Sequence, residues 1–421
     1  MTFRFLTASA AIMVAVSGTL PAAMAQEEES FFFRNKYVAV TERPQPEYDP
    51  LTVRLGTFEA KPEFGLGAGF TSNLFAVSEN ETDDTFLNVA PKVEVNSTWA
   101  RHSIGFEAVA DHLEYTDTGD ESRTNLIGRA FGDIDVSQNV SIFGGVRAAD
   151  LVEPRSNIAS VANAADPVDY SEVSADIGIE YTASRLRLRG RVELEEFDYE
   201  DVSLTSGLIQ DQDFRDREDT TLEVRASYAI DRDWAVFGEV QQVESDYDPA
   251  NVFNPFNRDS TGTIVRAGTD FELQRLIRGD IAVGFLSYEY DDAAFSDVDG
   301  LSVEANAQWF VTQLTTLTGS AQRSVEDPGL QSTNAAVLTG VAIRADHELR
   351  RNILLHAAVD FSEYDFENVN RTDDRFGLEV GGTWKLNRNV WFDASYSVLD
   401  QSSNVQEFTD NRLMIGLKFF P

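Results

Sequence analysis

Residues 172–194 decide the fold, and in one-letter code they read EVSADIGIEYTASRLRLRGRVEL. Apolar side chains such as Val173 and Ile177 alternate with polar ones such as Glu172, and the alternation resumes after the small residues Ala183-Ser184. A period of two is typical of a β-strand with one apolar and one polar face. This stretch therefore predicts two antiparallel strands joined by a tight turn.

The same alternation recurs from Leu51 to the end of the chain in about 18 segments, and bacterial outer-membrane barrels usually have even numbers of strands. The segments are joined alternately by tight connections such as Asn387-Arg388-Asn389 and by longer acidic stretches such as residues 200–216. Outer-membrane barrels have short periplasmic turns and long extracellular loops. We therefore predict an all-β, transmembrane, antiparallel up-and-down β-barrel in the outer membrane of a Gram-negative bacterium.

The competing interpretation is a soluble, secreted all-β protein such as an array of sandwich domains. Sandwich strands are commonly shorter, and their connections do not alternate regularly between short and long. A low mean hydropathy does not contradict the barrel, because only alternate residues of its strands contact lipid.

Three regions are expected along the chain. Residues 1–25 resemble a cleaved signal peptide, with Arg4, an apolar stretch and the small-residue motif Ala23-Met24-Ala25. Residues 26–50 are charged and contain prolines, so they predict a periplasmic N-terminal arm outside the main fold. Residues 51–421 form the barrel.

Aromatic residues near the segment ends predict the girdles that barrels place at the two membrane interfaces. Trp99 and Trp234 lie by short connections, and Tyr115 and Tyr199 lie by long ones. The final segment ends in Lys418-Phe419-Phe420-Pro421, which resembles the signal read by the barrel-assembly machinery. The expected partners are that machinery, outer-membrane lipid and lipopolysaccharide.

The polar faces of the segments predict a charged lumen. An 18-strand barrel has a backbone diameter of about 35 Å and a lumen of roughly 15 to 20 Å once side chains are included. The candidate lumen-facing charges are Glu172, Asp176, Glu180, Arg185, Arg187, Arg189, Arg191, Glu223, Arg225, Arg266, Asp270 and Glu272. They form either an electrostatic track for a solute or a ladder of cross-strand salt bridges that stiffens the wall.

The first barrel segment resembles that of the "putative β-barrel porin 2" family. Residues 54–64 (RLGTFEAKPEF) carry the R-x-G-x-F…P core of that family, and residues 70–75 (FTSNLF) follow it. Arg43-Pro44 and Tyr48-Asp49-Pro50 precede this stretch. The resemblance implies an outer-membrane exit for exopolysaccharide, capsular or adhesive polysaccharide, acting with a periplasmic polysaccharide export protein.

Several classes of function are excluded or disfavoured. The chain has no cysteine, and its formal net charge of −37 argues against a nucleic-acid partner. We expect no enzyme activity, cofactor or metal, because neither an H-E-x-x-H nor a G-x-S-x-G motif occurs. The acidic stretches at residues 246–248 and 297–300 are far from a calcium-binding loop.

The leading hypothesis is a pore for polysaccharide export. The alternative is a general diffusion porin for small solutes. A second alternative is a structural or adhesive barrel whose acidic loops bind an external partner.

Overall fold

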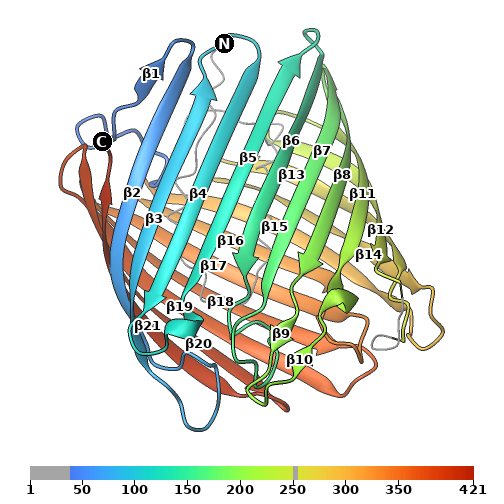
Figure 1. Cartoon of the computed structure of the whole chain (residues 1–421). Coiled ribbons are helices and arrows are strands. Elements are labelled where there is room, and N and C mark those ends of the chain that lie inside the picture. The colour runs from blue at the N-terminus through green and yellow to red at the C-terminus, as the bar shows by residue number, and fades with distance from the viewer. Residues whose placement is uncertain (1–37, 250–254) are drawn as a thin grey trace.

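The computed structural model describes residues 38–249 and 255–421. The predicted signal peptide and residues 26–37 of the predicted arm lie outside these ranges. The described chain forms a closed barrel of 18 antiparallel strands, which confirms the predicted fold class (Figure 1).

The barrel strands are β2 (Phe58–Thr71), β3 (Asp84–Ser97), β4 (Ser103–Tyr115), β5 (Arg123–Asp135), β6 (Val140–Val152), β7 (Asp169–Ala183), β8 (Leu186–Tyr199), β11 (Arg217–Ala229), β12 (Trp234–Tyr247), β13 (Ser260–Leu273), β14 (Ile277–Tyr290), β15 (Val298–Thr312), β16 (Thr315–Glu326), β17 (Ala336–Arg350), β18 (Ile353–Phe366), β19 (Arg371–Lys385), β20 (Val390–Ser403) and β21 (Phe408–Phe419). The smaller elements are β1 (Val53–Leu55), which pairs with the start of β2, a loop hairpin of β9 (Val202–Ser203) and β10 (Ile209–Gln210), and the 3-10 helices η1 (Gly119–Glu121) and η2 (Asp213–Arg215).

Pairing between the first and last barrel strands closes the sheet. β2 and β21 run antiparallel, with Phe64 opposite Phe419 and Thr71 opposite Arg412. Each barrel strand also pairs with the next barrel strand along the chain. A closed sheet leaves no unpaired edge, which matters in lipid because hydrocarbon offers no partners to backbone groups.

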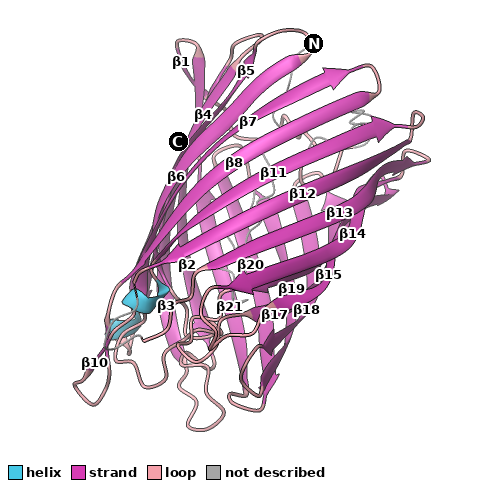
Figure 2. Ribbon diagram, turned by 90° about the vertical axis from the view of Figure 1, so that its right-hand side faces the viewer, coloured by secondary structure: helices cyan, strands magenta, loops and turns pink. Residues whose placement is uncertain are grey.

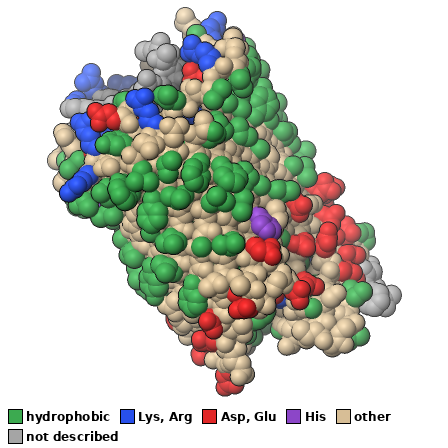
Figure 3. Space-filling model, turned by 60° about the vertical axis from the view of Figure 1, so that its left-hand side comes forward, with side chains coloured by type: hydrophobic (Ala, Val, Ile, Leu, Met, Phe, Trp, Pro, Cys, Tyr) green, Lys and Arg blue, Asp and Glu red, His purple; other side chains and the backbone are tan. Residues whose placement is uncertain are grey.

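The outer face of the barrel is apolar. Val173, Ile177 and Phe285 expose 51%, 62% and 74% of their surfaces. Figure 3 shows apolar side chains spread over the outside of the wall, with aspartate and glutamate gathered toward one end. An exposed apolar surface of this extent fits contact with hydrocarbon and would be unfavourable in water. No helix in the described ranges is long and apolar enough to cross a membrane.

The two ends of the barrel differ in their connections (Figure 2). Short turns join the strands at the end where β2 begins and β21 ends, which we call the turn end. Longer connections, including residues 153–168 and 200–216, lie at the opposite end, the loop end. Two connections at the loop end are short: residues 367–370 join β18 to β19, and residues 404–407 join β20 to β21.

The exposed tryptophans mark the turn end. Trp99, Trp234, Trp309 and Trp384 expose between 40% and 48% of their surfaces, and each lies in or next to a short turn. The indole ring has an apolar body and a polar N–H, so it is favoured at a membrane interface. These residues form the aromatic girdle expected at this end.

The described part of the arm, residues 38–50, lies within the turn end of the barrel. Val40 is 1% exposed, and its N–H donates to Thr316 Oγ1 of β16 at 3.1 Å. Arg43 forms an ion pair with Glu348 of β17 at 2.7 Å. This segment is therefore not outside the main fold as the sequence suggests, because its charged residues find partners on the inner wall.

Candidate functional site: the barrel lumen

The polar faces of β7 and β8 form part of the lumen wall, and their charges lie close to opposite charges. Arg187 lies 3.4 Å from Glu180, and Arg191 lies 3.4 Å from Asp176. These pairs join neighbouring strands, because the tight turn between β7 and β8 brings the two polar faces into register. The arrangement is that of a cross-strand ladder.

Three other charged residues predicted in this wall make contacts outside the β7–β8 pairs. Glu172 forms an ion pair with Arg147 of β6. Arg189 stacks over the ring of Phe143 on β6, with 4.4 Å from its guanidinium carbon to the ring centre. Arg185 is exposed in the turn, and its Nη1 donates to a main-chain oxygen. The predicted lumen position of Arg185 is not observed, because β8 begins only at Leu186.

A second group of charges joins β11, β12, β13 and β15. Glu239 lies between Arg225, at 3.6 Å, and Arg266, at 2.6 Å. Arg225 also contacts Asp270 at 2.9 Å, and Arg266 contacts Glu304 at 2.8 Å. The alternating signs leave this part of the wall nearly neutral, as expected of a ladder that stiffens the sheet.

The remaining two predicted residues lie on β11 and β13. Glu223 is on β11, directly opposite Arg191 in the strand pairing. Glu272 is 8% exposed and lies opposite Arg278 of β14. Sequence reasoning thus brought together residues that do share one wall, with Arg185 as the exception.

Aromatic rings lie flat on this wall beneath arginines. The ring of Phe143 occupies the space where a side chain at Gly178 would project, and Arg189 covers the ring. Phe237 lies in the same way over Gly268, with Arg225 3.6 Å above its ring centre. Because glycine lets the rings lie against the backbone, these side chains take up little of the lumen.

At the loop end, residues 153–168 cross the lumen, and we call them the crossing loop. The loop leaves β6 and returns to β7, but its tip contacts β19 on another part of the wall. Arg371 Nη2 donates to the main-chain oxygen of Ile158 at 3.2 Å, and Arg375 Nη2 donates to that of Ser156. The lumen is therefore narrowed by a loop attached at both its base and its tip.

Apolar contacts support the tip of the crossing loop. Ile158 is 8% exposed and packs in a cluster with Leu338 of β17 and with Tyr364 and Phe366 of β18. Burial of apolar surface adds stability to the hydrogen bonds from β19. The crossing loop is therefore held to three consecutive strands.

Buried ion pairs fix the base of the crossing loop to neighbouring loops. Arg155 donates to both carboxylate oxygens of Glu121, which belongs to η1. Arg215, in η2, lies 2.7 Å from Glu153. All four side chains are at most 8% exposed. Two-point arginine–carboxylate contacts are strong and directional, so these loops are rigidly connected.

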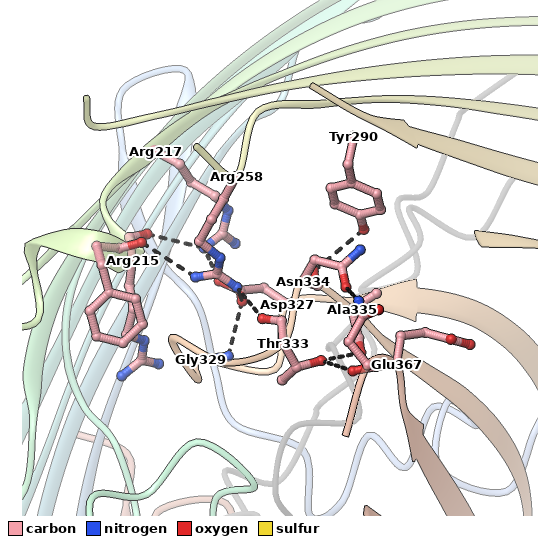
Figure 4. A network of polar contacts seen from close by, with 12 residues as sticks. Arg215, Arg217, Arg258, Tyr290, Asp327, Gly329, Thr333, Asn334, Ala335 and Glu367 are labelled. Atoms are coloured by element: carbon pink, nitrogen blue, oxygen red, sulfur yellow. Dashed lines mark hydrogen bonds and ion pairs between the residues drawn. The ribbon is translucent and has the colours of Figure 1, made fainter. Parts of the chain in front are cut away.

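A second buried network, centred on Asp327, joins the first residue of β11 to the loops that precede β13 and β17 (Figure 4). Arg258 lies 2.6 Å from Asp327 and Arg217 lies 3.1 Å from it. The N–H of Gly329 donates to the same carboxylate at 2.9 Å, and Arg258 donates to the main-chain oxygen of Thr333. Burial alone would raise the pKa of Asp327, but the guanidinium groups of Arg258 and Arg217 hold that pKa well below its ordinary value.

The arm narrows the opposite, turn end of the lumen. Asp49 lies 3.0 Å from Lys385 of β19, and the indole N–H of Trp391 donates to the main-chain oxygen of Tyr48 at 3.1 Å. Together with the contacts of Val40 and Arg43 on β16 and β17, these bonds fix the arm at several points of the wall.

One group of carboxylates could hold a cation. Asp201, Asp211 and Asp213 place oxygens within 4.8 Å of one another in residues 200–216. Two of these three residues are exposed, and exposed acidic groups commonly gather without an ion. Within the described ranges, the acidic stretches at 246–248 and 297–300 form no such group.

A closed barrel with an apolar outer face, a charged lumen and inward-folded connections defines an outer-membrane channel of the porin type. The chain belongs to the family described as "Putative beta-barrel porin 2", whose pattern matches residues 45–420. This match confirms the resemblance noted in the first barrel segment.

Solved barrels provide more distant similarities. OccK2 (OpdF) of Pseudomonas aeruginosa, in complex with glucuronate, is 9% identical with a TM-score of 0.45, over 86% of this chain and 98% of that one. The copper transporter OprC is 10% identical with a TM-score of 0.49, over 88% of this chain and 81% of that one. PirA, a siderophore receptor of Acinetobacter baumannii, is 7% identical with a TM-score of 0.47, over 85% and 80%. None of these similarities indicates what this chain transports. No match was found among curated proteins.

The sequence did not identify the residues that narrow the lumen. Arg371, Arg375 and Asp327 each lie in or next to stretches that read as acidic loops. Their partners are distant in the chain: Arg375 contacts a residue 219 positions away. The one available signal was the presence of arginines in otherwise acidic stretches, which suggests a specific partner for each.

Proposed function

We propose that this protein is a diffusion channel for small polar solutes, the alternative function considered from the sequence. The supporting observation is the crossing loop, whose tip is hydrogen-bonded to Arg371 and Arg375. A polymer needs one continuous wide path, whereas small solutes pass on either side of an obstacle. The arm likewise narrows the passage at the turn end. We assign the turn end to the periplasm and the loop end to the extracellular side.

The charged wall suits this role. Paired charges such as Arg266 and Glu239 give a hydrated surface with little net charge, which water-soluble molecules cross without tight binding. The aromatic rings that lie flat against Gly178 and Gly268 take up little of the lumen.

Polysaccharide export would require both the arm and the crossing loop to move aside. The crossing loop is held by hydrogen bonds, buried ion pairs and an apolar cluster, so its displacement would break many contacts together. This is why small solutes are proposed here in place of a polysaccharide.

The test is swelling of liposomes that contain the purified protein, with sugars of increasing size. We expect mono- and disaccharides to enter. An oligosaccharide of about six or more sugar units should be excluded, given the usual dimensions of a barrel lumen. A strain that lacks the protein should secrete normal amounts of polysaccharide. Loss of secreted polysaccharide, restored by complementation, would instead support export.

We also propose that residues 1–25 are removed during export and that the protein contacts lipopolysaccharide and is inserted by the barrel-assembly machinery. The sequence motif Ala23-Met24-Ala25 supports the first point. N-terminal sequencing of the protein from outer membranes should begin at Gln26. A start at Met1 would contradict cleavage.

A further inference from the structure

Strand β5 places two arginines on its lumen face. Their surroundings differ from those of the lumen arginines on β8, β11 and β13. Alternate residues of β5 face inward, and they include Arg123 and Arg129. Arg129 is partly exposed, and its guanidinium carbon lies 4.7 Å above the ring of Phe131 on the same strand. Within the described residues it makes no ion pair and no hydrogen bond.

The strand pairing explains why Arg129 has no carboxylate partner among the described residues. Its neighbour on β4 is Glu107, but Glu107 lies 3.0 Å from Lys92. Its neighbour on β6 is Arg147, which has the same charge and is already paired with Glu172. Arg129 therefore lies in a part of the wall where Glu107 and Glu172 are already paired with other cations.

Arg123 extends this positive region toward the loop end. It lies six residues from Arg129 on the same face, which is about 20 Å along a strand. Arg123 is 7% exposed and forms no ion pair or hydrogen bond with a described residue. Arg412 of β21 is close enough to interact with it electrostatically, and so are the carboxylates of Asp111 and Glu121. These carboxylates form no close ion pair with Arg123, so its guanidinium group is largely desolvated and can still gain from binding an anion.

The chemistry of the guanidinium group indicates the type of anion. Its planar N–H groups match the two oxygens of a carboxylate, and the contact with the ring of Phe131 positions the group on the wall. Stacking uses the face of the group and leaves the N–H edges able to bind a solute. Arg129 is partly exposed, so a small molecule in the lumen can reach it.

We propose that Arg129 binds the carboxylate of small solutes that cross the channel, and that Arg123 attracts them from the loop end. This inference rests on the proposed channel for small solutes and specifies their charge. The positive contact is on β5, and the Arg187–Arg191 segment named from the sequence belongs to a neutralised ladder.

The experiment uses the full-length mature protein and two measurements. Gluconate binding to the folded protein in detergent is measured by calorimetry, with sorbitol as the uncharged comparison. The permeability ratio of chloride to potassium is measured in planar bilayers from the reversal potential in a salt gradient. The variants are Arg129→Gln, Arg129→Lys and the double variant Asp176→Asn/Arg191→Gln, which removes one paired positive and one paired negative charge.

We expect the wild type to bind gluconate and not sorbitol, and Arg129→Gln to weaken gluconate binding about tenfold or more, as for loss of a charged hydrogen bond. Arg129→Gln should also lower the chloride permeability, while Arg129→Lys should keep most of it. The Asp176→Asn/Arg191→Gln control should match the wild type in both measurements.

Two results would overturn the inference: no gluconate binding by the wild type, or unchanged binding and permeability in Arg129→Gln. A barrel that binds gluconate through Arg129 but conducts no ions would retain the binding site and contradict the proposed channel. A barrel that conducts ions, but whose gluconate binding and permeability do not depend on Arg129, would support the proposed channel and contradict the binding site.

Discussion

Arg371 of β19 donates a hydrogen bond of 3.2 Å to the main-chain oxygen of Ile158, which lies 213 residues earlier in the chain. The guanidinium group is held in position by an ion pair with Asp373, which faces the same side of the strand and is fully buried. The donor is thus oriented by its own strand and meets the tip of the crossing loop. The width of the passage at the loop end consequently depends on a contact between distant parts of the sequence.

The double variant Arg371→Gln/Arg375→Gln should widen the channel. Each lost hydrogen bond from a charged donor costs about 1.5–3 kcal/mol, and both bonds hold the same loop tip. The crossing loop should then leave β19 for part of the time. Single-channel recordings should show a higher conductance, and liposomes should admit larger sugars than with the wild type.

Arg101→Gln is the matched control for that experiment. Arg101 lies in an exposed turn at the opposite end and makes only a weak contact of 3.5 Å to a main-chain oxygen. The Arg101→Gln substitution also removes a guanidinium group, but it does not touch the crossing loop. Equal conductance in the wild type and in Arg371→Gln/Arg375→Gln would mean that the loop does not limit the passage.

The arm should become accessible when its wall contacts are removed. Gln45 is 5% exposed within the arm, and the chain has no cysteine, so Gln45→Cys provides a single labelling site. In the presence of Glu348→Gln and Lys385→Gln, which remove the partners of Arg43 and Asp49, a polar maleimide should react several times faster.

The control for the arm is Gln45→Cys combined with Arg54→Gln. Arg54 forms an exposed ion pair with Glu59 at 3.3 Å outside the lumen contacts, and such pairs contribute little. Its labelling rate should equal that of Gln45→Cys alone. If the Glu348 and Lys385 substitutions also leave the rate unchanged, ion pairs do not hold the arm.

The fold could be predicted because its signals are local. Alternation along each strand and the length of each connection depend on nearby residues, and residues 172–194 contain both. Strand boundaries are less certain, which is why Arg185 was assigned to the wall although it lies in the turn. The Arg191–Asp176 pair was accessible from sequence because one tight turn sets its register.

The parts that narrow the lumen were not predictable for a physical reason. The contact of Arg155 with Glu121 forms only after the loops fold over the barrel, and no periodic pattern specifies it. The state of Arg129 depends on Lys92, two strands away, because Lys92 binds the glutamate that would otherwise pair with Arg129. Such competition between partners is visible only in three dimensions.

Asp327→Asn should loosen the loop end. Asparagine cannot balance the charges of Arg217 and Arg258, and removal of one member of a buried ion network typically costs about 3–5 kcal/mol. Hydrogen exchange of residues 327–335 should become much faster, while exchange in the barrel strands stays slow. Glu407→Gln, an exposed loop substitution, is the control and should leave exchange unchanged.

The pH dependence of this network has a definite sign. The pKa of Asp327 in the folded protein is held below its unfolded value near 4, so its stabilising contribution is complete above about pH 4. The contribution is lost only as the pH falls through the lower folded value. The difference in loop-end stability between the wild type and Asp327→Asn should therefore be the same at pH 8 and pH 5. A stability difference confined to pH 8 would contradict this account.

Asp216, in the loop before β11, should respond to pH in the opposite direction. Burial raises the pKa of Asp216 to about 7, although the N–H of Tyr199 donates to it, and the nearby Asp198 and Asp213 raise the pKa further. An acid with a raised folded pKa destabilises the fold when it ionises, so stability at this loop should fall from about pH 4 to about pH 7 and then level off. A spin label at Ser206→Cys should become more mobile between pH 5 and pH 8. Asp216→Asn should abolish that change, and a label whose mobility depends on pH equally in both backgrounds would exclude Asp216 as its origin.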